Sequence, residues 1–159
     1  MPSRMRSKNM TSIQGRSINK GIARAMALVS ATPINITASF TKLGNIYIPG
    51  QQSVINDRHH ELYRENVKGQ VLVFPSCIGS TYSGMVLMQL ICEGYGPAAI
   101  IVQDAEPLLT SGVILSDVWY RKQVPMVECR ADDFWNSITT GDTVEVDGVS
   151  GRIGIITLT

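Results

Sequence analysis

The sequence has almost no excess charge of either sign. Fourteen lysines and arginines face thirteen aspartates and glutamates, which leaves a formal net charge of +1 over 159 residues. Proteins that bind nucleic acid through its phosphates carry a basic patch, so this balance argues against nucleic acid as a partner. Long apolar runs are missing too, and none has the length of a membrane span or a signal-peptide core. We therefore expect a cytoplasmic protein that binds neither membrane nor nucleic acid.

Cysteine and histidine are scarce. The three cysteines, Cys77, Cys92 and Cys129, form neither an even disulfide set nor the paired spacing of metal ligands. The two histidines, His59 and His60, are adjacent, and their side chains would diverge on an extended segment. This favours a solvated or interface pair over substrate contact or metal ligation. We expect that this chain alone holds no metal ion and no iron–sulfur cluster.

The length suits one domain with a real core. Apolar residues make up 44% of the chain and charged residues 17%, as in a globular protein. Residues 1–11 contain Arg4, Arg6 and Lys8 and lack apolar periodicity. We expect a flexible N-terminal tail over residues 1–11 and one folded domain over residues 12–159.

The apolar pattern changes along the chain. Gly21 and Pro33 interrupt residues 17–36, where short strands are expected, and residues 40–68 form a long loop of the kind that usually has a function. A parallel βαβαβ unit is expected next, because continuous apolar runs suit strands covered on both faces. Its strands and helices are expected at residues 71–74, 85–92, 98–102, 110–121 and 124–128.

A helical turn at residues 132–135 and a hairpin around Asp147-Gly148, within residues 143–156, complete the pattern. The fold class is α/β. We expect a β/β/α domain in which the terminal strands close a barrel-like sheet beside the small parallel layer.

The segment between the first strand of this unit and its helix is the leading candidate site. It reads Phe-Pro-Ser-Cys-Ile-Gly-Ser-Thr-Tyr-Ser-Gly from Phe74 to Gly84. A helix start favours anions, because its first N–H groups lack helical partners. Ser80 could cap the helix or act in catalysis, and no neighbouring residue is an obvious base. The segment matches neither the G-x-S-x-G nucleophile elbow nor a phosphate-binding Walker loop.

Several other polar residues and one cysteine can be explained either by a function or by a structural role. Cys77 could be a reactive thiol near a helix start, but a small buried residue is favoured. Asp104 and Glu106 follow a strand at the edge where parallel sheets bind ligands, and capping of the next helix explains them equally well. Asp57 and Arg58 suggest a polar contact cluster on the long loop.

Several motifs, taken in order, resemble the small subunit of the aconitase X family. They are Asp-Arg-His-His at residues 57–60, Gly-Gln-Val-Leu-Val-Phe-Pro at 69–75, Gly-Ser-Thr at 79–81, Gly-Pro-Ala-Ala-Ile-Ile-Val at 96–102, Val124-Pro125 and Thr-Gly-Asp at 140–142. The resemblance covers residues 18–153. It implies a swivelling domain that works with a large subunit, which carries an iron–sulfur cluster and most of the substrate site.

The resemblance also implies an activity. The family's proton-accepting serine maps onto Ser80, and the segments that carry the motifs imply substrate contacts by Gly79, Thr81, Ser83, Asp57, Arg58 and His59. The reaction implied is the dehydration of a small hydroxy acid by a heterodimeric hydro-lyase. We expect cis-3-hydroxy-L-proline as the substrate; 5-phosphomevalonate is the alternative, and so is a non-catalytic binding or assembly module. Two segments depart from the family pattern, residues 41–49 and Cys77-Ile78.

Overall fold

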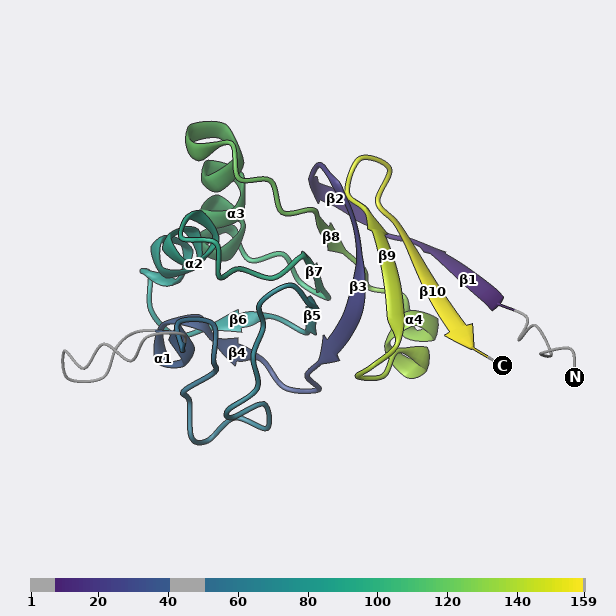
Figure 1. Ribbon diagram of the computed structural model, residues 1–159, viewed down its shortest axis with the longest axis horizontal. Coiled ribbons are helices and arrows are strands. Elements are labelled where there is room, and N and C mark those ends of the chain that lie inside the picture. Colours follow the sequence, from purple (N-terminus) through teal and green to yellow (C-terminus); the bar gives the residue numbers. More distant parts are fainter. Residues whose placement is uncertain (1–7, 41–50, 159) are drawn as a thin grey trace, which may run out of the picture.

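The computed structural model describes residues 8–40 and 51–158, and its elements alternate between strands and short helices (Figure 1). The strands are β1 (Lys8–Gln14), β2 (Arg16–Asn19), β3 (Ile22–Val29), β4 (Ile34–Asn35), β5 (Val71–Phe74), β6 (Cys77–Ile78), β7 (Ala99–Val102), β8 (Met126–Glu128), β9 (Thr143–Asp147) and β10 (Arg152–Leu158). The helices are α1 (Ile36–Phe40), α2 (Ser83–Cys92), α3 (Pro107–Tyr120) and α4 (Asp132–Ser137).

The expected parallel unit is present as β5-α2-β7-α3-β8. Strand β3 pairs in parallel with β5, β5 with β7, and β7 with β8. Every residue of β5 and β7 is buried, as continuous apolar runs predict. Leu72 and Phe74 belong to the core under α2 and α3, whereas Val71 and Val73 face a second core that includes Phe134 of α4. The parallel layer is therefore covered on both faces.

The other strands close the sheet. The order of the eight-stranded sheet is β1-β10-β9-β3-β5-β7-β8-β2, so its first and last strands are consecutive in the chain. Only Gly15 separates β1 from β2, and its N–H donates to Gly151 O at 2.8 Å. A Cβ on Gly15 would lie 2.6 Å from Glu128 O, which explains the glycine at this crossing. The barrel-like sheet and the hairpin formed by β9 and β10 are thereby confirmed.

Some boundaries differ from the expected ones. Strand β1 begins at Lys8 and pairs with β10, so Lys8 to Thr11 belong to the sheet and not to a tail. Helix α1 at residues 36–40 was not expected, since the predicted strands end at residue 36 and the predicted loop begins at residue 40. It forms because Asn35 Oδ1 accepts the Ala38 N–H at 3.0 Å and starts a helical turn. Helix α3 begins earlier than expected, at Pro107. Residues 51–68 lack helix and strand apart from one bridge, as predicted for a loop.

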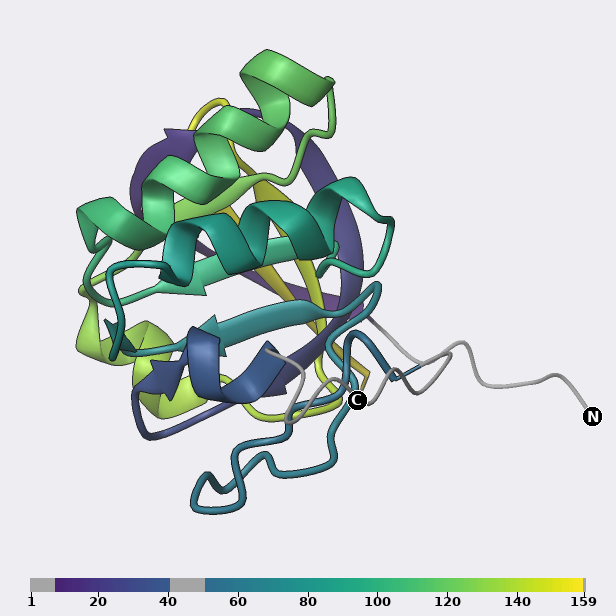
Figure 2. The ribbon, with the colours of Figure 1, turned by 90° about the vertical axis from the view of Figure 1, so that its left-hand side faces the viewer.

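Helices α2 and α3 lie side by side across one face of the sheet (Figure 2). They approach closely at two glycines: a Cβ on Gly112 would overlap Gly84 O, and a Cβ on Gly84 would overlap Leu108 O. The contact fixes where α2 begins, and therefore where the preceding turn lies. None of the helices in the described part of the chain is long and apolar enough to cross a membrane.

Substitution of Gly112 by alanine tests this contact. We expect G112A to lower the free energy of unfolding by roughly 2–3 kcal/mol, because the added methyl group forces the two backbones apart. Urea denaturation followed by circular dichroism measures the change. The matched control is V118A on the exposed face of α3, which should stay within about 0.5 kcal/mol of the wild type. Equal stability of G112A and V118A would contradict the close crossing.

Candidate functional site

Ser80 lies in the turn that leads into α2. The helix begins at Ser83 with Tyr82 at its N-cap, and no side chain caps it. Ser80 Oγ instead accepts the Tyr82 N–H at 3.1 Å, while Ser80 O accepts Ser83 Oγ at 2.7 Å and the Ser83 N–H at 3.1 Å. The capping interpretation of Ser80 is therefore wrong in its usual form. Its hydroxyl is half-buried and lies at the positive end of a ten-residue helix.

Gly79 holds the turn against α1. Its φ of 102° lies in the left-handed region that favours glycine, and a Cβ there would be 2.6 Å from Asn35 Oδ1. The neighbouring pair Cys77–Ile78 forms β6, which pairs in parallel with β4. Because Gly79 has no side chain, the Asn35 amide can pack directly against the turn that contains Ser80. The same amide starts α1. No local pattern pointed to Asn35, because its partner Gly79 is distant along the chain.

Helix α1 connects this turn to the long loop. The Asn56 N–H donates to Ser39 O at 2.9 Å, so the loop contacts α1 near its C-terminal end, whereas Gly79 contacts the residue before its first turn. Among the described residues, no hydrogen bond or ion pair joins Asp57, Arg58 or His59 directly to the turn at Gly79 to Ser83. Asp57 Oδ1 accepts the His59 N–H at 3.0 Å, and Arg58 and His59 are exposed.

The two histidines were expected to be a solvated or interface pair, but His60 is not solvated, because only 9% of its surface is exposed. Its Nδ1 accepts the Leu62 N–H at 3.1 Å, so the proton of the neutral ring is on Nε2. That Nε2 lies 3.2 Å from both Ser30 Oγ and Thr32 Oγ1, and donates to these hydroxyls. His60 therefore ties the loop to the end of β3.

Glu61 completes the same contact. Its Oε1 accepts Ser30 Oγ at 2.8 Å, Thr32 Oγ1 at 3.1 Å and the backbone N–H groups of Ala31 at 2.7 Å and Thr32 at 3.0 Å. Burial raises the pKa of this carboxyl, but the four hydrogen bonds outweigh burial and hold the pKa below its ordinary value of 4.5. Ser30, Thr32 and Glu61 could not be singled out from the sequence, because hydroxyls and one glutamate in a charged run are common at surfaces.

The acidic residues after β7 and at the end of β8 have structural roles. Glu106 is the N-cap of α3 and its carboxylate accepts the Leu109 N–H at 3.0 Å, which confirms the capping interpretation. Asp104 pairs with Arg130 at 3.3 Å. Glu128 is 7% exposed; burial raises its pKa, but the Ala105 N–H at 2.8 Å and Arg16 at 3.1 Å bring the pKa below its ordinary value.

The cysteines do not fit an iron–sulfur cluster held by this chain. Cys77 lies on β6, Cys92 ends α2 and Cys129 follows β8, and all three are free. Burial raises the pKa of the Cys77 and Cys129 thiols, which disfavours the thiolates that ligate iron. In residues 8–40 and 51–158, no three His, Cys, Asp or Glu side chains gather as a metal ion would require.

Comparison with known proteins decides the family. The family model described as "Aconitase X swivel domain" matches residues 12–155. The chain belongs to this family. Named relatives and a solved structure are also similar to this chain. They confirm the family and the fold class that were expected from the sequence.

Two relatives of this swivel domain are named phosphomevalonate dehydratase small subunit. The one from Methanocella arvoryzae is 40% identical over 89% of this chain and 96% of its own length. The one from Methanosarcina acetivorans is 32% identical over 91% of this chain and 90% of its own length. The crystal structure of Thermococcus kodakaraensis aconitase X in its holo form matches with a TM-score of 0.77 and 28% identity over 92% of this chain and 99% of the other.

The chain is thus a dehydratase small subunit of the aconitase X type. Of the two departures from the family pattern, Cys77-Ile78 forms β6 beside β4, and it keeps Ser80 at the helix start. The other departure, residues 41–49, lies outside the described residues, as do residues 1–7 of the expected tail.

The Glu61 contact predicts a dependence of stability on pH. Because the pKa in the folded state lies below 4.5, the stabilisation is fully present above pH 4.5 and is lost as the pH falls through the folded-state pKa. We expect E61Q to unfold at lower urea concentration at neutral pH, and to converge with the wild type in acid.

The control is E65Q, an exposed glutamate of the same segment, whose urea midpoint should follow that of the wild type at every pH. A difference between E61Q and the wild type that stays constant from neutral pH into acid would show that the charge of Glu61 is not responsible.

Proposed function

We propose that this chain is the small subunit of a phosphomevalonate dehydratase. The relatives named above support this substrate, and they favour it over cis-3-hydroxy-L-proline, the first expectation from the sequence. The single structural observation that carries the catalytic part is the Ser80 hydroxyl, half-buried at the start of α2 in a turn held by Gly79.

Ser80 would act as the proton acceptor. In the proposed elimination, Ser80 Oγ as alkoxide takes the proton from the carbon next to the one that bears the hydroxyl. The electrons of that C–H bond form the double bond, and the hydroxyl leaves as hydroxide. Ser80 then returns the proton to this hydroxide, which gives water and restores the alkoxide. A serine hydroxyl is a very weak acid, so its alkoxide needs stabilisation. The Tyr82 N–H at 3.1 Å and the helix start supply part of it.

The rest must come from the partner. Within residues 8–40 and 51–158 no basic side chain forms a hydrogen bond with Ser80 Oγ, and the departure of the hydroxyl needs groups that these residues do not provide. We propose that a large subunit supplies them together with the iron–sulfur cluster, in a heterodimer located in the cytoplasm. The name small subunit in the relatives supports such a partner. Gly79, Thr81, Ser83, Asp57, Arg58 and His59 remain the proposed substrate contacts of this chain.

An apolar surface surrounds the Ser80 turn and suits the large subunit. Its members are large side chains that water reaches although they are apolar: Ile78 at 52% exposed, Tyr82 at 63%, Met85 at 61% and Leu108 at 41%. Three of them lie within five residues of Ser80 in the sequence, and exposed large apolar side chains that gather in one region mark protein interfaces. A large subunit docked here would cover Ser80 and exclude water from the substrate.

Replacement of Ser80 tests the catalytic proposal. In the complex reconstituted with the large subunit, we expect S80A to lower kcat for phosphomevalonate roughly 100- to 10,000-fold, because the proton acceptor is lost. KM and complex formation should hardly change, since the hydroxyl is small and the turn keeps its backbone contacts. Steady-state kinetics measure this split. S12A, on exposed β1, is the control and should match the wild type. Undiminished turnover by S80A would leave a non-catalytic module as the better account.

Replacement of Met85 tests the interface. We expect M85E to weaken binding of the large subunit at least ~30-fold, because a charge is desolvated at the centre of the apolar surface. Calorimetric titration of the two subunits measures the dissociation constant. The control V149E places the same charge at an exposed valine in the turn between β9 and β10, and binding should not change. Equal binding of M85E and V149E would place the large subunit elsewhere.

A further inference from the structure

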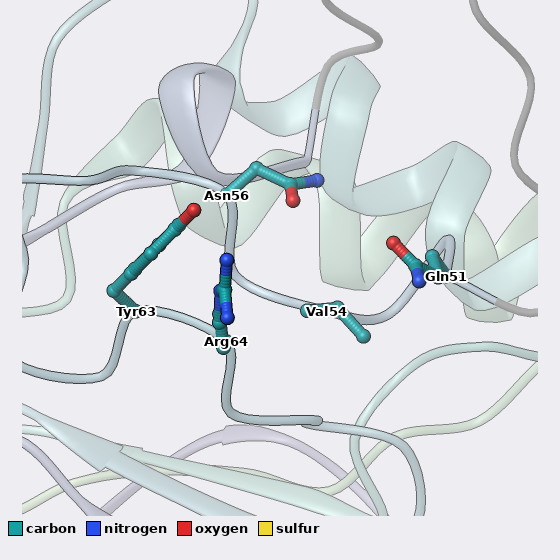
Figure 3. A pocket seen from close by; sticks show the side chains of 5 residues that line it. All are labelled: Gln51, Val54, Asn56, Tyr63 and Arg64. Atoms are coloured by element: carbon teal, nitrogen blue, oxygen red, sulfur yellow. The ribbon is translucent and has the colours of Figure 1, made fainter.

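A polar pocket on the long loop has no role in the site described so far. It has a volume of about 480 Å³ and is lined by Gln51, Val54, Asn56, Tyr63 and Arg64. Figure 3 shows the Tyr63 hydroxyl and the Arg64 guanidinium both directed toward Asn56, with Gln51 on the opposite side of Val54. Four of these five side chains carry hydrogen-bond donors, and the volume is in the range of small-ligand sites.

Backbone pairing between two stretches of the loop holds the pocket open. The Arg64 N–H donates to Ile55 O at 2.8 Å, and the Ile55 N–H donates to Glu65 O at 2.9 Å. Arg64 has a φ of 71°, in the left-handed region, although it is not a glycine. Non-glycine residues in this region are strained and gather at functional sites. A glycine would adopt this φ at lower energetic cost. The presence of arginine at this position therefore indicates that its side chain has a role.

The charge of Arg64 is not neutralised by a carboxylate. In the described part of the chain neither Arg58 nor Arg64 forms an ion pair, and the Arg64 guanidinium lies 5.2 Å from the centre of the Tyr63 ring. A hydrogen bond from Arg64, with the charges of Arg64 and Arg58, lowers the pKa of the Tyr63 phenol.

Two of the three nearest carboxylates in the sequence, Glu61 and Asp57, accept hydrogen bonds outside the pocket. Glu61 accepts from the turn after β3, and Asp57 accepts the His59 N–H. Glu65 is exposed on the stretch that pairs with Ile55. The pocket therefore presents cationic and neutral donors in a chain whose net charge is only +1, a combination that suits an anion with several acceptor oxygens.

We propose that this pocket binds the phosphoryl group of the substrate, with Arg64 as the charged donor and Tyr63 and Asn56 as neutral ones. The proposal rests on the proposed function, which supplies a phosphorylated substrate. Both the pocket and the Ser80 turn are connected to α1: the Asn56 N–H donates to Ser39 O in the helix, and Gly79 packs against Asn35, the residue before its first turn.

Phosphate binding by the full chain tests the pocket without any turnover. Inorganic phosphate is titrated into the isotope-labelled protein while amide NMR shifts are followed. We expect shifts at Asn56, Tyr63 and Arg64 in the wild type that vanish in R64Q. R121Q is the matched control, because Arg121 is exposed and also has a positive φ, of 55°; its phosphate shifts should match the wild type. Shifts that persist in R64Q, or that never appear at the pocket, overturn the proposal.

Kinetics on the complex with the large subunit connect the pocket to the substrate. R64Q should raise KM for phosphomevalonate roughly 10- to 100-fold and weaken inhibition by inorganic phosphate in parallel, while kcat stays within a few-fold. An unchanged KM in R64Q shows that the pocket does not hold the substrate's phosphoryl group, even if it binds free phosphate. If the wild-type complex does not turn over phosphomevalonate at all, the proposed function fails, and the NMR titration alone decides whether the pocket binds phosphate.

Discussion

The parallel pairing of β3 with β5 is the constraint on which the rest of the structure depends. Its register sets Val29 opposite Val73, and the Ser30 N–H extends it by donating to Val73 O at 2.8 Å. Both strands therefore end at the same edge of the sheet. The segment after β3 holds the long loop through Ser30 and Thr32, and the segment after β5 becomes the Ser80 turn. Ligands of parallel α/β layers bind at this edge.

Two further contacts fix the position of Ser80 at that edge of the sheet. The glycine crossing of α2 and α3 fixes the start of α2, and the Asn35 contact with Gly79 fixes the turn before it. His60 and Glu61 hold the loop without taking part in the proposed reaction, because their polar atoms are already occupied by the end of β3. In the proposed reaction the described residues thus contribute the Ser80 hydroxyl on a rigid support, and the metal chemistry is assigned to the proposed partner.

Much of the fold was predictable because its strands obey simple rules. The runs at Val71–Phe74 and Ala99–Val102 are continuously apolar, and Asp147-Gly148 marks the hairpin, so strands and their connection followed from pattern alone. Helix α1 was not predictable, since its first turn depends on a hydrogen bond from the Ala38 N–H to the side chain of Asn35, the last residue of β4. The burial of His60 depends on hydroxyls contributed by a distant strand end. Local sequence carries no trace of either contact.

The candidate site was predictable only in part, for the same reason. The Ser80 turn has a local signature, a strand followed by glycine and hydroxyl residues and then a helix. The pocket beside Arg64 has none, because its donors come from two paired stretches of an irregular loop and its strain appears only in backbone dihedrals.

The most direct test of the central claim is a substrate comparison on the complex of this chain with its large subunit. Phosphomevalonate and cis-3-hydroxy-L-proline are supplied separately, and dehydration is followed by mass spectrometry, with each subunit alone as the reference. The account predicts loss of water from phosphomevalonate by the complex only. Dehydration of the hydroxyproline instead, or equal activity of the large subunit without this chain, would contradict it.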